Sequence, residues 1–377
     1  MPHANTLWVV DQAKSLGFDL CGVVRMEEFP ELQRTPEWLA RGYAGEMKYL
    51  ADPRRSDPRT AMPGIRSAIV CLLNYSTARP LSNDPSLPAD SSRPSGWISR
   101  YAWGDDYHEV LRKRLDALVE TLPERFAEPF EARAYVDTGP VQERILAKYA
   151  GLGWLGKNTL LLNQMLGSFF FLGVILTTLD LEPSLEANEL PPPDLCGSCR
   201  RCLDACPTQA FVEPYVMDAR KCISYLTIEL RGSIPEEFRE PMGNHVFGCD
   251  ICQDVCPWNR RAPIVAMPQF EPRVFQSSGE NGSEENFPAG VDSLYLPRIE
   301  WLLGLSEAEF RQLFRGTPVI RTKWRGLLRN ACIAAGNSGI RPGMASHARI
   351  GILLERLAAS EDQVVAESAR WALSCIQ

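Results

Sequence analysis

The chain has 377 residues, of which 45% are hydrophobic and 23% are charged. This length and composition predict two or three domains with a sizeable buried core. The formal net charge of -7, from 47 acidic and 40 basic side chains, argues against bulk nucleic-acid binding without sequence preference, although it allows a local basic patch.

Helices and strands alternate through the first 180 residues. Apolar spacing predicts a helix over residues 6–16 that ends at Gly17, a strand over 18–24, a buried central strand over 67–75 and a helix over 107–120. Residues 80–96 are rich in Pro, Ser and Asp and predict a loop. No G-x-G-x-x-G motif follows a strand, so a nucleotide site of the Rossmann type is not indicated.

The longest uncharged stretch, residues 158–179, is long enough to raise the question of a membrane span. Polar and glycine residues interrupt it, and it is better interpreted as two buried strands joined by a turn. Residues 1–8 have neither the basic nor the apolar region of a signal peptide. We therefore expect a cytoplasmic protein without a membrane partner.

Two segments combine several kinds of polar side chain: S-R-Y-A-W-G-D-D-Y-H at 99–108 and Y-V-D-T-G-P-V-Q-E-R at 135–144. Asp137 ends an apolar strand that begins near Ala134, and a Gly-Pro turn leads from it into a predicted helix over 141–150. Ligands bind at strand ends in α/β sheets. An Asx turn at Asp137 fits this residue equally well, and for His108 a hydrogen-bonded structural role is favoured over that of a ligand.

Eight of the 12 cysteines lie within residues 196–256. They form C-G-S-C-R-R-C-L-D-A-C-P from residue 196, a single Cys222, and C-D-I-C-Q-D-V-C-P from residue 249. The first run keeps the C-x2-C-x2-C-x3-C-P spacing of bacterial ferredoxins with two 4Fe-4S clusters, in which the fourth cysteine ligates the other cluster. The pattern predicts a two-cluster ferredoxin-type domain.

The crossover of the fourth cysteine divides the eight ligands into two sets. Cluster one takes Cys196, Cys199, Cys202 and Cys256, and cluster two takes Cys206, Cys222, Cys249 and Cys252. Zinc and disulfides are the alternatives. The three-cysteine runs do not resolve into the pairs typical of zinc sites, and a chain dense in disulfides would be expected to carry a signal peptide. Cys21, Cys71, Cys332 and Cys375 lie outside the pattern and are expected to be small buried apolar residues.

The last part of the chain predicts helices over 306–314, 321–335, 345–357 and 362–376, after a polar linker at 276–290. Two similar pieces, R-N-A-C-I-A-A-G and E-S-A-R-W-A-L-S, begin 38 residues apart, at residues 329 and 367. Helix pairs at a period near 40 are typical of HEAT-type repeats. The first repeat carries a predicted basic face, made of Arg315, Arg321, Lys323, Arg325 and Arg329 around Trp324.

Six motifs together carry a resemblance to a known family. They are R-Y-A-W-G-D-D-Y-H, V-D-T-G-P-V-Q-E-R, A-G-L-G-W-L-G-K-N-T, C-G-S-C-R-R-C-L-D-A-C-P-T-Q-A, C-I-S-Y-L-T-I-E and G-C-D-I-C-Q-D-V-C-P-W-N. In this combination the chain resembles the epoxyqueuosine reductases, cobalamin-dependent iron-sulfur enzymes of tRNA queuosine biosynthesis. The resemblance runs from about residue 18 to residue 260.

The resemblance implies an α+β protein of three domains: an N-terminal α/β cobalamin-binding domain (1–190), a ferredoxin-like two-cluster domain (191–262) and a linker with C-terminal α-helical HEAT-like repeats (263–377). It implies base-off cobalamin between the first two domains. The implied cobalamin contacts are Arg55, Ser99, Tyr101, His108, Asp137, Arg144, Lys157, Asn158, Leu161 and Leu172. Asp137 is the implied proton donor, and enclosure under the corrin is expected to raise its pKa toward working pH.

The implied reaction reduces epoxyqueuosine to queuosine at the wobble position of a tRNA anticodon, the last step of queuosine biosynthesis, with electrons from an external low-potential donor. An RNA substrate favours phosphate contacts over a merely solvated helix surface, and the candidates are Lys221, Arg231, Lys323 and Arg325. We expect a monomer.

Two other classes of protein match parts of the sequence. A reductive dehalogenase-like cobalamin enzyme would act on a small molecule, but such proteins usually carry a twin-arginine signal, which residues 1–8 lack. A plain ferredoxin-type electron-transfer protein would not need the first 190 residues or their polar motifs. Bound corrinoid would distinguish an epoxyqueuosine reductase from a plain electron-transfer protein, and dependence on RNA would distinguish it from a dehalogenase-like enzyme.

Overall fold

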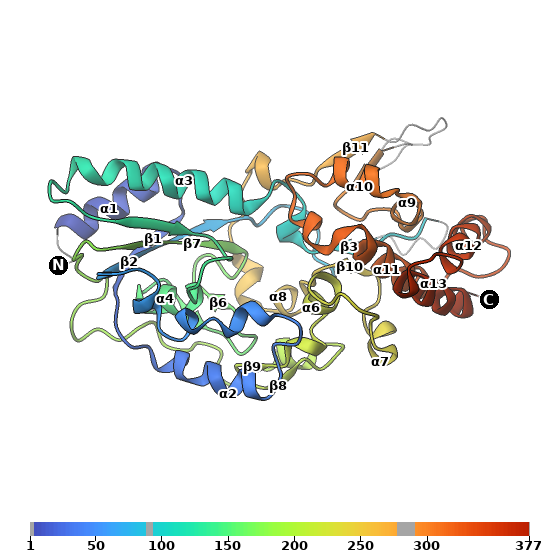
Figure 1. Cartoon of the computed structure of the whole chain (residues 1–377), viewed down its shortest axis with the longest axis horizontal. Helices are drawn as coiled ribbons and strands as arrows, with labels where there is room; N and C mark the ends of the chain where they lie inside the picture. Colours follow the sequence, from blue (N-terminus) through green and yellow to red (C-terminus); the bar gives the residue numbers. More distant parts are fainter. Residues whose placement is uncertain (1–3, 88–92, 277–290, 377) are drawn as a thin grey trace.

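The structure, a computed structural model, describes residues 4–87, 93–276 and 291–376. Figure 1 shows an elongated molecule in which a sheet with its flanking helices forms one end and the last helices form the other, with the cysteine-rich segments between them. In these ranges no helix has both the length and the apolar character needed to cross a membrane.

A four-stranded antiparallel sheet organises the N-terminal part, in the strand order β1-β2-β7-β4. Its strands are β1 Leu20–Arg25, β2 Ser67–Asn74, β7 Phe170–Thr177 and β4 Ala132–Tyr135. Every residue of β2 is buried, because this strand lies inside the sheet and both faces of the sheet are covered. The central strand predicted from the apolar run is therefore confirmed.

Helices cover both faces of this sheet (Figure 1). On one face lie α1 (Ala4–Ser15) and α3 (Tyr107–Thr121), and on the other lies α4 (Glu143–Tyr149). Alternate residues of β2 serve the two cores: Ile69 packs with the first pair of helices, whereas Val70 packs with α4, because successive strand residues point to opposite faces. Gly17, at φ +84°, follows the end of α1 as the sequence predicts.

The remaining predicted elements of this part are present but shorter. The helix expected over 141–150 is α4, and the two strands expected within 158–179 are the short β6 and the long β7. The other elements are η1 Pro30–Arg34, α2 Thr35–Ala40, η2 Lys48–Ala51, η3 Pro53–Arg55, η4 Pro58–Thr60, β3 Trp97–Ile98, η5 Arg100–Ala102, η6 Leu122–Glu124, β5 Trp154–Leu155 and β6 Leu161–Leu162.

The cysteine-rich part consists of short elements joined by loops. They are α5 Arg201–Asp204, β8 Phe211–Glu213, β9 Val216–Met217, η7 Ala219–Lys221, α6 Ile223–Ile228, α7 Glu236–Arg239, β10 His245–Phe247, α8 Ile251–Asp254 and η8 Pro257–Arg261. Strand β10 pairs in parallel with β3 of the N-terminal part. The two parts therefore share backbone hydrogen bonds, and the domain boundaries given above stay predictions.

The C-terminal part is helical, as the sequence predicts. Its elements are η9 Pro268–Phe270, β11 Val274–Gln276, β12 Val291–Ser293, α9 Ile299–Gly304, α10 Glu307–Leu313, η10 Pro318–Thr322, α11 Lys323–Gly336, α12 Ala345–Ala358 and α13 Gln363–Ile376. Helix α13 packs against both α11 and α12. Apart from Gln276 at the end of β11, the predicted linker lies outside the described residues. The HEAT-like reading stays a prediction.

One residue of the predicted basic face does not lie on the surface. Arg329 is only 1% exposed, and its guanidinium donates hydrogen bonds to the carbonyl oxygens of Leu226, Leu230 and Gly232. These carbonyls lie in and after the last turn of α6, where a helix leaves oxygens without internal partners. The prediction that Arg329 belongs to an exposed basic face is wrong, because α11 uses this side chain to dock on α6.

Candidate active site and cluster sites

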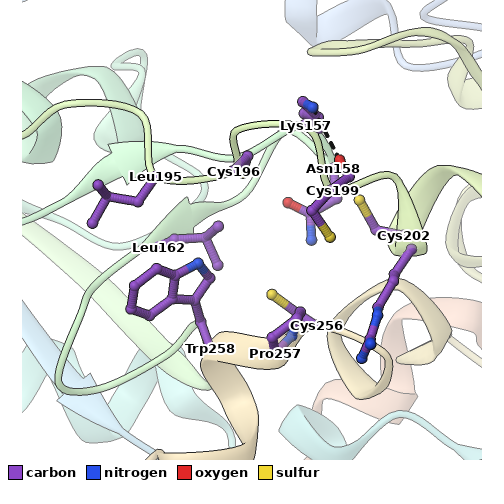
Figure 2. A pocket seen from close by; sticks show the side chains of 11 residues that line it. Lys157, Asn158, Leu162, Leu195, Cys196, Cys199, Cys202, Cys256, Pro257 and Trp258 are labelled. Atoms are coloured by element: carbon purple, nitrogen blue, oxygen red, sulfur yellow. Dashed lines mark hydrogen bonds between the residues drawn. The ribbon is translucent and has the colours of Figure 1, made fainter.

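Four cysteine side chains line one cavity of about 220 Å3. Figure 2 shows Cys196, Cys199, Cys202 and Cys256 around this space, with Leu162, Leu195 and Trp258 on its apolar side. Four thiols around a cavity with apolar walls are a suitable donor set for one 4Fe-4S cluster. They are the four cysteines that the sequence assigns to cluster one.

The other four cysteines form a second group. Burial raises the pKa of the Cys252 thiol, and the nearby charges of Cys222 and Cys206 add to this effect. Burial raises the pKa of Cys249 in the same way, together with the charges of Cys252 and Cys222. These mutual effects show that the thiols lie close together, and bound iron would stabilise them as thiolates. Among the described residues no three metal-binding side chains converge on one ion, which a cluster does not require because its four thiolates bind four different irons.

Hydrogen-bond donors of Trp154 and Lys157, in the β5–β6 region, lie beside the cysteines assigned to cluster one. Lys157 Nζ donates to the carbonyl oxygens of Gly197 and Cys199. The indole Nε1 of Trp154 is buried without a nitrogen or oxygen partner. Burial raises the pKa of Cys196, whereas the backbone N–H of Lys157 and the indole of Trp154 act in the opposite direction. Donors of this kind stabilise a thiolate, so these surroundings fit a cluster.

A second and larger cavity, of about 590 Å3, lies where the three parts of the chain meet. Its size is typical of ligand pockets. Side chains from η2, η3, the β4–α4 loop, the start of α4, β9, η7 and η10 line it, among them Tyr49, Arg55, Asp137, Glu143, Arg144, Met217, Ala219 and Arg321. The cavity therefore combines apolar walls with carboxylates and guanidinium groups.

Asp137 lies in the loop after β4 and lines this cavity, and its side chain is about half-exposed. Its backbone has φ +54°, in the left-handed region where non-glycine residues are uncommon. The Oε1 atom of Glu143 accepts a hydrogen bond of 2.7 Å from the Asp137 backbone N–H, which holds the loop in this conformation. Two cationic side chains approach the carboxylate: His108 Nε2 at 3.5 Å and Arg321 Nη1 at 4.0 Å from Oδ2.

His108 stands at the start of α3, and its ring is held on both sides. Asp106, the N-cap of this helix, accepts a hydrogen bond from the His108 backbone at 3.0 Å and contacts Nδ1 of the ring at 2.7 Å. The Tyr107 ring stacks on the imidazole, with centroids 4.1 Å apart. The Nε2 atom is buried and has no partner within hydrogen-bond distance, so it is directed at Asp137 without a bond to any other group.

Neighbouring charges shift the pKa values of three side chains at this cavity. Burial alone would raise the pKa of Asp137, but the hydrogen bond and charge of His108 and the charge of Arg321 hold it below its usual value. Burial would lower the pKa of His108, but Asp106 and Asp137 raise it to about 9. Burial and the charge of Asp137 raise the pKa of Glu143 to about 8. In the chain itself, neighbouring cations outweigh desolvation at Asp137; the rise of its pKa expected under a bound corrin stays a prediction.

The comparisons with known proteins agree with this geometry. Residues 195–259 match the 4Fe-4S double cluster binding domain, and residues 55–138 match the family described as epoxyqueuosine reductase QueG, DUF1730. The chain is 44% identical over 334 residues to the epoxyqueuosine reductase of Gloeobacter violaceus, covering 88% of this chain and 96% of that protein. It is 40% identical to the Pseudomonas aeruginosa enzyme, covering 88% and 84%.

The chain belongs to the epoxyqueuosine reductase family. The double-cluster match includes all eight assigned cysteines, which confirms the iron-sulfur prediction. A solved epoxyqueuosine reductase with an epoxyqueuosine-modified tRNA stem loop has a TM-score of 0.80 and 29% identity, covering 98% of this chain and 89% of that one. A Bacillus subtilis structure, described with its catalytic aspartate loop swung out of the active site, has a TM-score of 0.75 and 27% identity, covering 98% of both chains.

The residues that the family resemblance offers for cobalamin do not all lie at one place. Arg55, Asp137 and Arg144 line the 590 Å3 cavity. His108 does not line it, but His108 Nε2 lies 3.5 Å from Asp137 Oδ2. The Lys157 ammonium instead holds the cluster-one loop, and Asn158 lines the cluster-one cavity. A cobalamin contact of these last two residues stays a prediction.

The other four expected contacts lie away from the lining of this cavity. Ser99 is buried and donates a hydrogen bond to Asp250. Burial raises the pKa of Tyr101, and the nearby charge of Asp137 adds to this rise. Leu161 and Leu172 belong to the core under α4. Their part in cobalamin binding stays a prediction that the packing does not test.

Three of the four expected RNA contacts lie near one another. Arg231 Nη1 contacts the carbonyl oxygens of Arg321 and Thr322, at 3.2 and 3.3 Å, and Lys323 follows directly. Burial lowers the pKa of Arg329 to about 9, and the charges of Arg231 and Arg325 contribute to this decrease. Both cations therefore lie near Arg329. Lys221 lies on η7, beside the cluster ligand Cys222.

Sequence reasoning missed several groups that surround Asp137. Glu143 stands in the motif that drew attention to Asp137, so a second carboxylate six residues on was a usable signal. Arg321 was assigned to the basic face, but its Nε donates to Glu229 at 2.7 Å and its guanidinium faces Asp137. Nothing in the local sequence connects a residue near position 320 with one near 137.

Proposed function

We propose that this protein reduces epoxyqueuosine to queuosine in the anticodon of a tRNA, with two 4Fe-4S clusters and cobalamin as its cofactors. Family membership supports the reaction, since the chain covers nearly the whole length of a relative that carries this name. The observation that carries the proposal is the position of Asp137, an acidic side chain at the cavity where all three parts of the chain meet. The external electron donor and the monomeric state belong to the same proposal.

The residues of the cavity fit a cobalamin. Trp38, Leu50 and Met217 provide apolar surface, and Arg55 and Arg144 provide donors suited to the amide groups at the edge of a corrin. When bound, cobalamin would supply the reductive cleavage of the carbon–oxygen bond, using electrons that the clusters deliver. Ala219 lines the cavity three residues before Cys222, so we assign cluster two to the cavity side and cluster one to the side where the electron donor enters.

The chain's own residues bind the substrate, exclude water and move protons. Removing the epoxide oxygen as water consumes two electrons and two protons. Asp137 holds its carboxylate toward the space where that oxygen would lie, and the Glu143 contact fixes the loop from behind. A positioned acid of this kind contributes about 100-fold or more to the rate. A tRNA stem fits the group Arg231, Lys323 and Arg325, while the modified base is turned out of its stack into the cavity.

The replacement Asp137→Asn tests this function. It keeps the shape of the side chain and removes the acid, so turnover of an epoxyqueuosine-containing stem loop should fall by about 100-fold or more, while both clusters and bound cobalamin are retained. The measurements are mass spectrometry of the RNA, ultraviolet-visible spectra and an iron count under anaerobic conditions. Asp116→Asn is a matched control, because Asp116 is a half-exposed carboxylate on α3. Full activity of Asp137→Asn would assign Asp137 to loop structure alone.

The comparisons do not favour the two other classes. A dehalogenase-like enzyme predicts turnover of a halogenated small molecule without RNA, and a plain electron carrier predicts a chain that binds no corrinoid. Purified protein that reduces the modified stem loop and retains corrinoid excludes both. Retained corrinoid with no activity on the stem loop would instead return the reductive dehalogenase class to consideration.

A further inference from the structure

Two side chains that the proposed reaction has not yet used, Asp106 and His108, form a row with Asp137 at the edge of the cavity. Asp106, His108 and Asp137 follow one another from the N-cap of α3 to the cavity, with 2.7 Å between Asp106 Oδ1 and His108 Nδ1 and 3.5 Å between His108 Nε2 and Asp137 Oδ2. Asp106 and His108 keep 21% and 27% of their side-chain surfaces exposed. The row therefore joins partly solvated groups to a carboxylate that faces the reacting space.

We infer that His108 is the proton reservoir of the site, and that each proton reaching the substrate oxygen passes from His108 Nε2 through Asp137. The inference rests on the proposed function, since it names the source of the protons that the reaction consumes. Asp106 holds the other ring nitrogen and fixes the direction of Nε2. His108 acts through Asp137 and is therefore a positioning and supply residue.

The geometry supports a transfer in this direction. Nε2 is buried and has no other partner, so the nearest acceptor for its proton is Asp137. A separation of 3.5 Å is longer than the 2.6–3.2 Å of a working proton transfer, but such contacts often tighten only when substrate is bound.

This transfer of protons from His108 through Asp137, here called the relay, resolves a difficulty in the role of Asp137 as an acid. A carboxyl group whose pKa is held below its usual value carries almost no proton near neutral pH. The neighbouring imidazole, with a pKa raised to about 9, carries one. Asp137 can then take that proton and pass it on in the same event, while solvent reprotonates His108. Two such cycles supply the two protons that, with two electrons, convert the epoxide oxygen into water.

Charged groups on every neighbouring element bear on this titration. Asp106 and Tyr107 lie on the same helix as His108, Asp137 and Glu143 face it from the β4–α4 region, and Arg321 approaches from η10. Arg273 also acts on Asp106 from the C-terminal part. Burial would lower the pKa of His108, but the carboxylates of Asp106 and Asp137 outweigh it and raise this pKa to about 9, so the imidazole is mostly protonated below pH 9.

The first test measures the imidazole itself and needs no turnover. The sequence contains four histidines, so nitrogen NMR of histidine-labelled, cluster-loaded protein can follow each ring, with His108 assigned by its loss in His108→Gln. We expect His108 to titrate near pH 9, about 2.5 units above an ordinary histidine. Replacing Asp106 with Asn should lower this midpoint. A His108 midpoint at or below the ordinary value of about 6.5 overturns the relay.

The second test uses the pH dependence of the reaction. In the parent protein, turnover should fall as pH rises through 9, because the reservoir empties. In His108→Gln the fall of turnover with rising pH should begin at lower pH, and the rate near pH 7.5 should be about 10- to 100-fold below that of the parent. Added imidazole should restore part of the rate of His108→Ala. The matched control is His347→Gln, since His347 lies on α12 at the far end of the molecule.

Two outcomes separate the relay from the function on which it rests. If His108→Gln keeps the parent's rate and pH limb while Asp137→Asn is inactive, the reaction stands and the relay is wrong. If the parent protein does not reduce the modified stem loop at all, the proposed function fails and the relay fails with it. A merely structural role for His108 predicts lost clusters or lost corrinoid, and no rescue by imidazole.

Discussion

The chain builds its two cavities in different ways. The cluster-one cavity takes all four sulfur ligands from residues 196–256, and their spacing alone revealed them. The 590 Å3 cavity takes its lining from residues 38–55, 137–144, 217–219 and 321. A cluster of this type takes most of its donors from short cysteine runs whose spacing can be recognised in the sequence. A site for a large cofactor and an RNA base instead needs a concave space, and packing of distant elements creates it.

This difference predicts how each cavity responds to damage. A lost cluster ligand has no substitute, because the four irons need four thiolates. A lost side chain at the larger cavity removes one of several groups that act together, so its effect should be graded.

Replacing one cluster ligand should have the largest effect. We expect Cys202→Ser and Cys252→Ser each to lower the iron content after anaerobic reconstitution from about eight to about four per chain, and to abolish turnover because the electron path is interrupted. Electron paramagnetic resonance of the reduced protein should show which cluster remains in each variant. Cys375→Ser is the control, because Cys375 lies outside both sets; the expectation that this thiol is buried is wrong, since the last turn of α13 leaves it exposed. Equal loss of both clusters in each variant would contradict the division into two sets.

Much of the fold could be predicted because its signals are local. The buried strand over 67–75, the helix over 107–120 and the C-terminal helices follow from apolar periodicity. The HEAT-like arrangement and the domain boundaries are not settled by such signals. Strand β10 of the cysteine-rich part pairs with β3 about 150 residues earlier, and no local pattern predicts a pairing of this kind.

The site could be predicted in part, for the same reason. Asp137 was found because it follows a strand and precedes a turn, and His108 because its motif is rich in polar groups. Their contact, and the resulting opposite shifts of their pKa values, depend on the way α3 and the β4–α4 loop meet. Arg329 illustrates the converse: in sequence it resembles its exposed neighbours, but α6 covers it.

Arg321 tests whether the C-terminal part belongs to the active site. Its guanidinium is about one third exposed and lies 4.0 Å from Asp137, so solvent screening limits the interaction to about 1 kcal/mol or less. We expect Arg321→Gln to lower kcat by about 3- to 10-fold through a less well-placed Asp137, with little change in stem-loop affinity. The kcat of Arg321→Lys should lie between that of Arg321→Gln and that of the parent.

Steady-state kinetics with the modified stem loop separate kcat from KM for these variants. The pair with Glu229 at 2.7 Å is also lost in Arg321→Gln, so a Glu229→Gln variant shows how much of the change comes from that contact. Weakened RNA binding at unchanged kcat would move Arg321 out of the active site and into the RNA interface.

Lys323 and Arg325 should have the smallest effects, and they should differ from each other. Lys323 is exposed, whereas Arg325 forms an ion pair with Asp362 at 2.6 Å. Each phosphate contact changes the salt dependence of binding by a slope of about 0.9. We therefore expect Lys323→Ala to weaken stem-loop binding a few-fold and to reduce the slope by about one contact, while Arg325→Ala does less, because its cation is already partly neutralised. Affinities measured over a range of salt concentrations, with Arg231→Ala for comparison, test this order. If Arg231→Ala and the double variant of Lys323 and Arg325 bind like the parent at every salt concentration, the RNA is held elsewhere and the C-terminal helices contribute to the active site only through Arg321.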